Sequence, residues 1–151
     1  MIKTVRTDSE NNDFKGLVQL LDGELADRDG DEHSFYDQFN SIEGLKYVVV
    51  LFEHLKPVAC GAIKPLDKKT MEVKRMFTLP KDRGKGLATK VLSELEIWAE
   101  EMGYTTCMLE TGKRQPEAIS LYVKNGYQPI PNYGQYKGVE NSVCFKKSLR
   151  Q

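Results

Sequence analysis

The most informative stretch of the chain is Arg83-Gly84-Lys85-Gly86-Leu87-Ala88-Thr89. It stands before the helix that the sequence predicts most clearly, because apolar residues recur there at steps of three and one from Ala88 to Met102. Two glycines beside a helix N-terminus allow close backbone approach, and the first turn offers unpaired N–H groups with a partial positive charge. The stretch therefore predicts an anion site, most naturally for a phosphate or pyrophosphate, with Arg83 and Lys85 as nearby cations.

Three phosphate-binding patterns can be compared with this loop. A Walker A loop fails, since Leu87 follows Gly86 where that motif has lysine. A dinucleotide fingerprint is weak, because Thr89 replaces the third glycine and the loop follows the fourth predicted strand rather than the first. The pattern (Q/R)-x-x-G-x-(G/A) is matched in full by Arg83, Gly86 and Ala88.

Hydrophobic periodicity on both sides of the loop predicts an alternating series of elements. Strands are expected at 2–7, 47–52, 58–63, 71–78, 107–109, from 127 and at 143–145, and helices at 13–26, 34–39, 88–102 and 117–124. The alternation in 71–78 slips at Lys74-Arg75, which predicts a β-bulge. Three consecutive strands favour an antiparallel meander, and the later βαβ order favours a parallel segment. The fold class is therefore α/β, with one mixed sheet and helices on both faces.

Length and composition narrow the function classes. The 151 residues fit one domain, spanning 1–151. Lys plus Arg and Asp plus Glu both number 22, so the chain lacks the basic excess of a nucleic-acid binder. The longest apolar run, Val48 to Phe52, is too short for a membrane span, and the first residues lack a signal-peptide core. We expect a cytoplasmic protein with neither nucleic-acid nor membrane partners.

The chain has few cysteines and histidines, the residue types that most often bind transition metals. Cys60, Cys107 and Cys144 lie in apolar stretches without CxxC spacing, and the chain has only two histidines. The acidic run 27–32 lacks the spacing of a calcium loop and is expected to be a polar loop. We interpret the cysteines as small buried hydrophobes and predict no metal site.

Two further segments extend the pattern of the anion loop. Val73–Pro80 looks like the strand that precedes such a loop, and Ala118–Tyr127 looks like an A-x-x-L-Y-x-x-x-G-F/Y segment. In this order and spacing, the three segments resemble the GNAT superfamily of acetyl-CoA-dependent N-acetyltransferases over about residues 47–130. The resemblance implies the GNAT fold, a mixed and mostly antiparallel sheet whose fourth and fifth strands splay apart.

The resemblance also implies how acetyl-CoA would bind. The pantetheine arm would lie between the splayed strands, and the pyrophosphate would lie on the loop. Gln115 stands where the family often has asparagine, and its amide can make the same kind of contact. The implied cofactor residues are Met76, Phe77, Thr78, Arg83, Gly84, Lys85, Gly86, Leu87, Ala88, Thr89, Gln115 and Tyr122.

Direct acetyl transfer to an amine, through a tetrahedral intermediate, needs a deprotonated amine and an acid for the leaving thiolate. Tyr122 matches the family's usual general acid, and a phenol with a pKa near 10 is protonated at neutral pH; the alternative is an aromatic packed in the core. Glu72 and Glu110 are both candidate bases. Either can instead be a structural carboxylate, and water can also carry the proton away.

The acceptor implied by the resemblance is a small amine or amino acid rather than a protein. Two segments are candidates to border its site. One is the acidic run in residues 24–40, which is either a rim for a cationic amine or a solvated face; its acids are Glu24, Asp27, Asp29, Asp31, Glu32 and Asp37. The other is the insert 129–136, either pocket lining or surface loop. A protein N-acetyltransferase, a non-catalytic acyl-CoA-binding regulatory module and transfer of a longer acyl group are the alternatives, and a homodimer is an option common in the superfamily.

Overall fold

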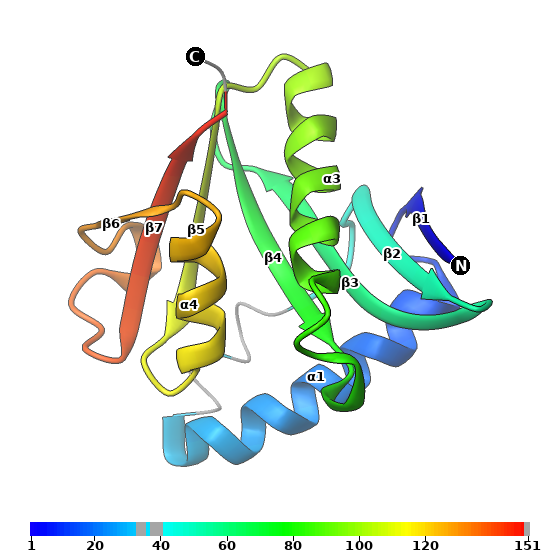
Figure 1. The fold of residues 1–151 in the computed structure, drawn as a ribbon. Coiled ribbons are helices and arrows are strands. Elements are labelled where there is room, and N and C mark those ends of the chain that lie inside the picture. The colour runs from blue at the N-terminus through cyan, green and yellow to red at the C-terminus, as the bar shows by residue number, and fades with distance from the viewer. Residues whose placement is uncertain (33–35, 37–40, 150–151) are drawn as a thin grey trace.

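A computed structural model describes residues 1–32, 36 and 41–149 of the chain. One seven-stranded sheet runs through it in the order β1-β2-β3-β4-β5-β7-β6 (Figure 1). The strands are β1 (Ile2–Thr7), β2 (Tyr47–Glu53), β3 (Lys56–Pro65), β4 (Thr70–Thr78), β5 (Thr106–Gly112), β6 (Gln128–Ile130) and β7 (Ser142–Ser148). The helices are α1 (Asn12–Asp29), α3 (Leu87–Glu101) and α4 (Pro116–Lys124), with 3₁₀ turns η1 (Gly30–Glu32), η2 (Pro80–Asp82) and η3 (Gly134–Tyr136).

The order of elements confirms the sequence prediction, with one correction. Residues 27–29 were expected in a polar loop, but α1 continues through them to Asp29. Arg28 pairs along the helix, since its Nη2 lies 3.0 Å from Glu24 Oε1 one turn earlier, and Asp29 is buried. Gly30, at φ +54, follows the last helical residue. The helical turns predicted for 34–39 lie, except for Tyr36, outside the described residues.

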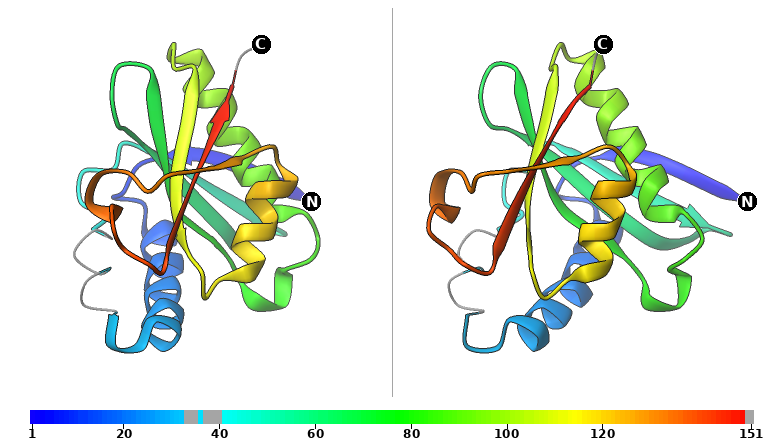
Figure 2. Two further views of the ribbon diagram at one scale, coloured as in Figure 1. Left: turned by 90° about the vertical axis from the view of Figure 1, so that its left-hand side faces the viewer. Right: turned by 60° about the vertical axis from the view of Figure 1, so that its left-hand side comes forward.

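Both faces of the sheet are covered by helices, as predicted (Figure 2). Alternating residues of β2 explain this, because Val48 and Val50 pack against α1 on one face while Val49 and Leu51 pack in the cluster of α3 on the other. The α1 side is filled by Phe14, Leu17, Val18 and Leu21. The α3 side is filled by Val91, Leu92, Leu95 and Ala99, and the same cluster reaches α4 at Tyr122.

The sheet opens between β4 and β5, which confirms the predicted splay. The two strands pair in parallel at Thr70–Thr106, Met71–Cys107 and Glu72–Met108. No further pair follows within residues 70–112, all of which the structure describes, and the strands diverge toward α4 and α1 (Figure 1). All other neighbouring strands are antiparallel.

The β-bulge predicted at Lys74-Arg75 is also confirmed. Cys60 pairs with Phe77 but Ala62 pairs with Lys74, so two residues of β4 oppose Gly61 alone. Arg75 takes up the bulge with φ +59, a conformation that L-residues rarely adopt. Gly61 leaves room for the side chain of Met76 on the α3 side, where an added Cβ would clash with Met76 Sδ and lie 3.0 Å from Val91 Cγ1.

Within the described part of the chain, no helix combines the length and the apolarity needed to cross a membrane.

Gly61→Ala is expected to lower the free energy of unfolding by about 1–3 kcal/mol, because the new methyl group overpacks the contact with Met76. The matched control is Gly23→Ala in α1, where an added Cβ has no heavy atom within 4 Å. That change should instead stabilise by about 0.5–1 kcal/mol, the usual gain of alanine over glycine in a helix. Urea denaturation measures the free energy of unfolding of both variants. Equal changes in the two would contradict the packing role of Gly61.

Candidate functional site

A groove of about 360 Å³ lies along the opening of the sheet, between the edge of β4 and helix α4. Nearly all of the cofactor residues predicted from the sequence line it: Met76, Phe77, Thr78, Arg83, Gly84, Gly86, Leu87, Ala88, Thr89, Gln115 and Tyr122. The side chain of Lys85 is the exception. Its Nζ lies 2.9 Å from Asp82 Oδ1 and 3.3 Å from Glu53 Oε1, and these hydrogen bonds raise the pKa of Lys85.

The loop before α3 has the geometry of an anion cradle. Gly84 and Gly86 have φ +82 and +80, which glycine adopts without strain. An added Cβ at either position has no heavy atom within 4 Å, so the loop faces open space. The N-terminus of the 15-residue helix α3 follows directly and adds its partial positive charge. These features fit a phosphate or pyrophosphate group.

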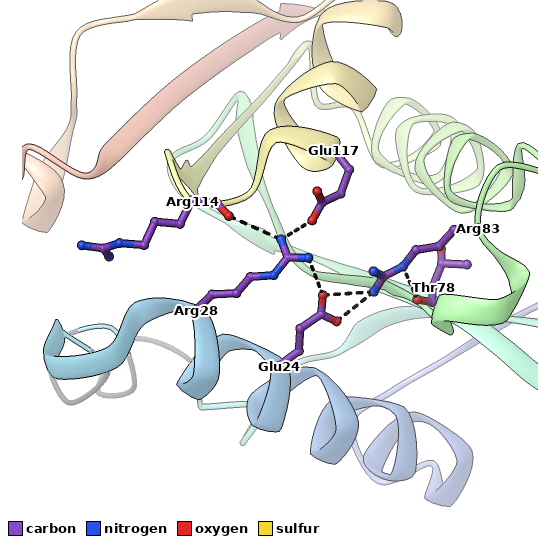
Figure 3. Close-up of polar contacts among 6 residues, drawn as sticks. All are labelled: Glu24, Arg28, Thr78, Arg83, Arg114 and Glu117. Atoms are coloured by element: carbon purple, nitrogen blue, oxygen red, sulfur yellow. Dashed lines mark hydrogen bonds and ion pairs between the residues drawn. The ribbon is translucent and has the colours of Figure 1, made fainter.

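Arg83 links this loop to β4 and α1 (Figure 3). Its Nε donates to the Thr78 carbonyl oxygen at 2.9 Å, and its Nη2 lies 2.8 Å from Glu24 Oε2. Its guanidinium also lies over the Phe77 ring, 5.6 Å from the centroid. Arg83 is therefore held on the wall of the groove, and its guanidinium joins the loop to Glu24 on α1.

A chain of charges continues from Glu24 across the mouth of the groove to α4 (Figure 3). Arg28 pairs with Glu24 and also with Glu117 in the first turn of α4, and its Nη1 lies 3.5 Å from the Arg114 carbonyl oxygen. The C-terminal half of α1 is thus tied to both sides of the opening, at Arg83 and at Glu117.

Arginines pair with three acids of the predicted acidic rim. Glu24 pairs with Arg28 and Arg83, and Arg114 pairs with Glu32 and lies 3.8 Å from Asp29. At these three positions an acid and an arginine therefore lie side by side. Asp37, also assigned to that rim, lies outside the described residues.

A second cavity, of about 110 Å³, lies against the groove on the α1 face of the sheet. The two spaces share five lining residues: Leu21, Met76, Gln115, Ala118 and Tyr122. The second cavity is charged, with lining from Asp29, Glu72, Lys74, Arg75 and Glu110. A ligand in the groove and a ligand in the cavity would therefore meet beside Tyr122.

Tyr122 is both a packed aromatic and a wall of the two cavities. Its ring lies edge-on to Tyr127 at 5.8 Å and tilted to Phe145 at 6.2 Å. Burial, and then the charge of Glu110, raise the pKa of its hydroxyl above the ordinary value. The phenol is therefore protonated at any physiological pH and can donate a proton.

Glu72 lies in the second cavity but is already engaged. It accepts a hydrogen bond from the Tyr133 hydroxyl at 2.7 Å, and Lys74 Nζ lies 3.9 Å from its other oxygen. Tyr133 belongs to the insert 129–136, and Tyr136 from the same insert lines the cavity. The insert therefore borders this space, which favours pocket lining over a plain surface loop.

Glu110, on β5, differs in its surroundings. Its Oε2 is buried and has no hydrogen-bond partner among the described residues. Burial raises the pKa of its carboxyl to about 7, with the charges of Asp29 and Glu72 adding to the rise, while Ser142 and Lys74 oppose it. A carboxyl that titrates near neutral pH can both accept and release a proton at working pH.

Sequence reasoning missed Arg75 as a site residue. It identified Arg75 only as the bulge position, although bulges often redirect a side chain next to a functional site. The cysteine interpretation is confirmed, since Cys60, Cys107 and Cys144 are all buried and unbridged. Burial raises the pKa of the Cys60 and Cys107 thiols to about 12, which leaves them unreactive at neutral pH.

Comparisons with known proteins agree with this architecture. The family model described as Acetyltransferase (GNAT) family matches residues 14–127. YjgM of Escherichia coli, an uncharacterized N-acetyltransferase, is 40% identical over 96 residues, 62% of this chain and 57% of that protein. The matched region spans about six-tenths of the length of the first curated relatives.

Solved structures extend the likeness over the whole fold. A Klebsiella pneumoniae protein that carries the name acyl-CoA N-acyltransferase superposes with a TM-score of 0.84, at 27% identity, over 99% of both chains. PaiA N-acetyltransferase of Thermoplasma acidophilum, solved in complex with coenzyme A, has a TM-score of 0.73 at 16% identity, over 98% of this chain and 99% of that one.

Glu110→Gln is expected to change how stability depends on pH. Between the ordinary value of 4.5 and about 7, the folded protein binds a proton at Glu110 that the unfolded chain does not, so the free energy of unfolding falls as pH rises through this window. Glutamine has no such proton. Between pH 4.5 and pH 8, the free energy of unfolding of the variant should therefore rise relative to that of the wild type by up to about 3 kcal/mol, as measured by urea denaturation. Parallel curves for the two proteins would contradict the raised pKa.

Proposed function

The chain belongs to the GNAT family of acetyltransferases, and we propose that it is an acetyl-CoA-dependent N-acetyltransferase. It moves an acetyl group directly to the primary amine of a small molecule or amino acid, and residues 1–151 act as one domain. The observation that carries the proposal is the meeting of two differently lined cavities at Tyr122. One has an anion cradle, and the other has a carboxyl of pKa about 7.

The groove suits the donor, acetyl-CoA, which supplies an activated acetyl thioester. The loop from Gly84 to Thr89 would hold the pyrophosphate through its backbone N–H groups. Beyond Glu72, the edge of β4 that faces the opening has no strand partner in the described chain, so Met76 to Thr78 can pair with the pantetheine amides. The coenzyme A complex of the Thermoplasma relative supports the same choice of ligand.

Two proton-transfer roles follow from the surroundings of the acidic groups. The Tyr122 hydroxyl would give its proton to the sulfur that leaves. The Glu110 carboxylate would take a proton from the acceptor's ammonium, and we assign this role to Glu110 rather than Glu72 because Tyr133 already occupies Glu72. A pKa near 7 lets Glu110 act as a base at neutral pH.

Gly86→Glu is expected to abolish acetyl-CoA binding, because a carboxylate would project into the cradle against the pyrophosphate. The matched control is Gly138→Glu, which places the same charge at φ +76 on a loop that does not line the groove. With acetyl-CoA at about 100 times its Kd, the wild type and the control should gain about 2.7 kcal/mol of stability in a thermal-shift assay. Normal binding by a folded Gly86→Glu variant would remove the loop from the cofactor site.

Tyr122→Phe is expected to lower kcat about 10²–10⁴-fold, the usual contribution of a general acid, while the affinity for acetyl-CoA stays nearly unchanged. Thiol release measures kcat, and the thermal shift measures binding. Tyr104→Phe, which lines neither cavity, is the control. Unchanged turnover would exclude Tyr122 as the acid. Binding without turnover in the wild type, with any amine, would instead favour a non-catalytic acyl-CoA-binding module.

A further inference from the structure

Arg75 reaches the α1-side cavity only because of the bulge. Consecutive residues of a regular strand point to opposite faces, and Val73 packs in the cluster of α3, which directs Lys74 to the α1 side. A regular β4 would then turn Arg75 toward α3. The left-handed φ of +59 instead brings its guanidinium to Asp22 on α1, so Lys74 and Arg75 line the same cavity.

The guanidinium of Arg75 is only partly satisfied. Its side chain is 2% exposed, and its Nη2 pairs with Asp22, whose own side chain is 42% exposed. The Nε is buried and has no acceptor in the part of the chain that the structure describes. A buried cationic donor without a partner costs free energy. An oxyanion supplied by a ligand would satisfy it, and the planar fork of arginine is well suited to a carboxylate.

The same cavity also holds a hydrogen-bond acceptor without a partner among the described residues. Glu110 Oε2 has no donor, as described above, and Glu110 lines the cavity from β5 while Arg75 lines it from β4. A plain amine could donate a hydrogen bond to Glu110 but would leave Arg75 Nε without an acceptor. A ligand that carries both an ammonium and a carboxylate could donate to Glu110 and accept from Arg75.

We propose that the acetyl acceptor is a free amino acid, whose carboxylate binds Arg75 while its amine is directed to Glu110. This inference rests on the proposed N-acetyltransferase function and narrows its acceptor. The cavity volume of about 110 Å³ is below the roughly 150 Å³ of a void that holds one benzene, so it favours a small acceptor over a large one. A peptide N-terminus lacks the neighbouring carboxylate and would not satisfy Arg75.

The first test uses the wild-type protein with acetyl-CoA and matched trios of acceptors. Each trio contains an amino acid, its α-carboxamide and its decarboxylated amine, taken across the protein amino acids, and thiol release is measured. We expect the best acceptor to be an amino acid, with KM about tenfold or more higher for its amide and its amine. An amine or amide whose KM is equal to or lower than that of its amino acid would overturn this inference but not the proposed function. No thiol release from any acceptor would overturn the proposed function as well.

The second test separates substrate binding from a structural ion pair. Arg75→Gln should raise KM for the best amino acid about tenfold or more and leave KM for its decarboxylated amine nearly unchanged. Asp22→Asn removes the competing carboxylate, so KM for the amino acid should stay constant or fall. If the pair were only structural, the two variants would behave alike, and that result would overturn the role of Arg75. Should Arg75→Gln not fold, Asp22→Asn/Arg75→Gln removes both charges together and carries the same KM prediction.

Discussion

Three residue pairs hold β4 to β5, and the separation of these strands beyond Glu72 and Met108 opens the space in which the groove and the cavity lie. The sheet stays continuous because β4 remains paired with β3 and β5 with β7. Backbone groups on the two edges that face the gap are left for a ligand to satisfy. Helices on opposite faces then wall the opening, so that a groove and a smaller cavity meet at Tyr122.

The ion pairs across the opening serve mainly to position α1 rather than to stabilise the fold. Ion pairs of partly exposed side chains contribute about 0–1 kcal/mol each, so the path from Arg83 through Glu24 and Arg28 to Glu117 contributes modestly to stability. The stability of α1 comes instead from its apolar stripe, which packs on the sheet around Phe14 and Leu17. The charged path sets where the C-terminal half of α1 lies relative to the anion loop and to α4.

The α1-side cavity shows how surroundings give different roles to side chains of one type. Glu72 and Glu110 lie on adjacent strands and line the same space. Tyr133 donates to Glu72, whereas Glu110 keeps a buried oxygen without a donor among the described residues, and its pKa rises to about 7. Arg75 and Lys74 bring positive charge to the same wall, which makes the cavity dipolar rather than simply acidic.

The sequence alone determined the order of elements, the glycine loop before α3, the bulge at Lys74-Arg75 and the resemblance to the family, because each depends on residues close together in the chain. Local polarity misled at the end of α1, where 27–29 stay helical and Arg28 pairs with Glu24 one turn earlier. Tertiary structure alone decided which of the two carboxylates keeps a buried oxygen without a donor among the described residues, and where Arg75 points. Tyr133 lies 61 residues from Glu72, and Asp22 lies 53 residues from Arg75. Contacts of that range form only when the sheet and its helices pack.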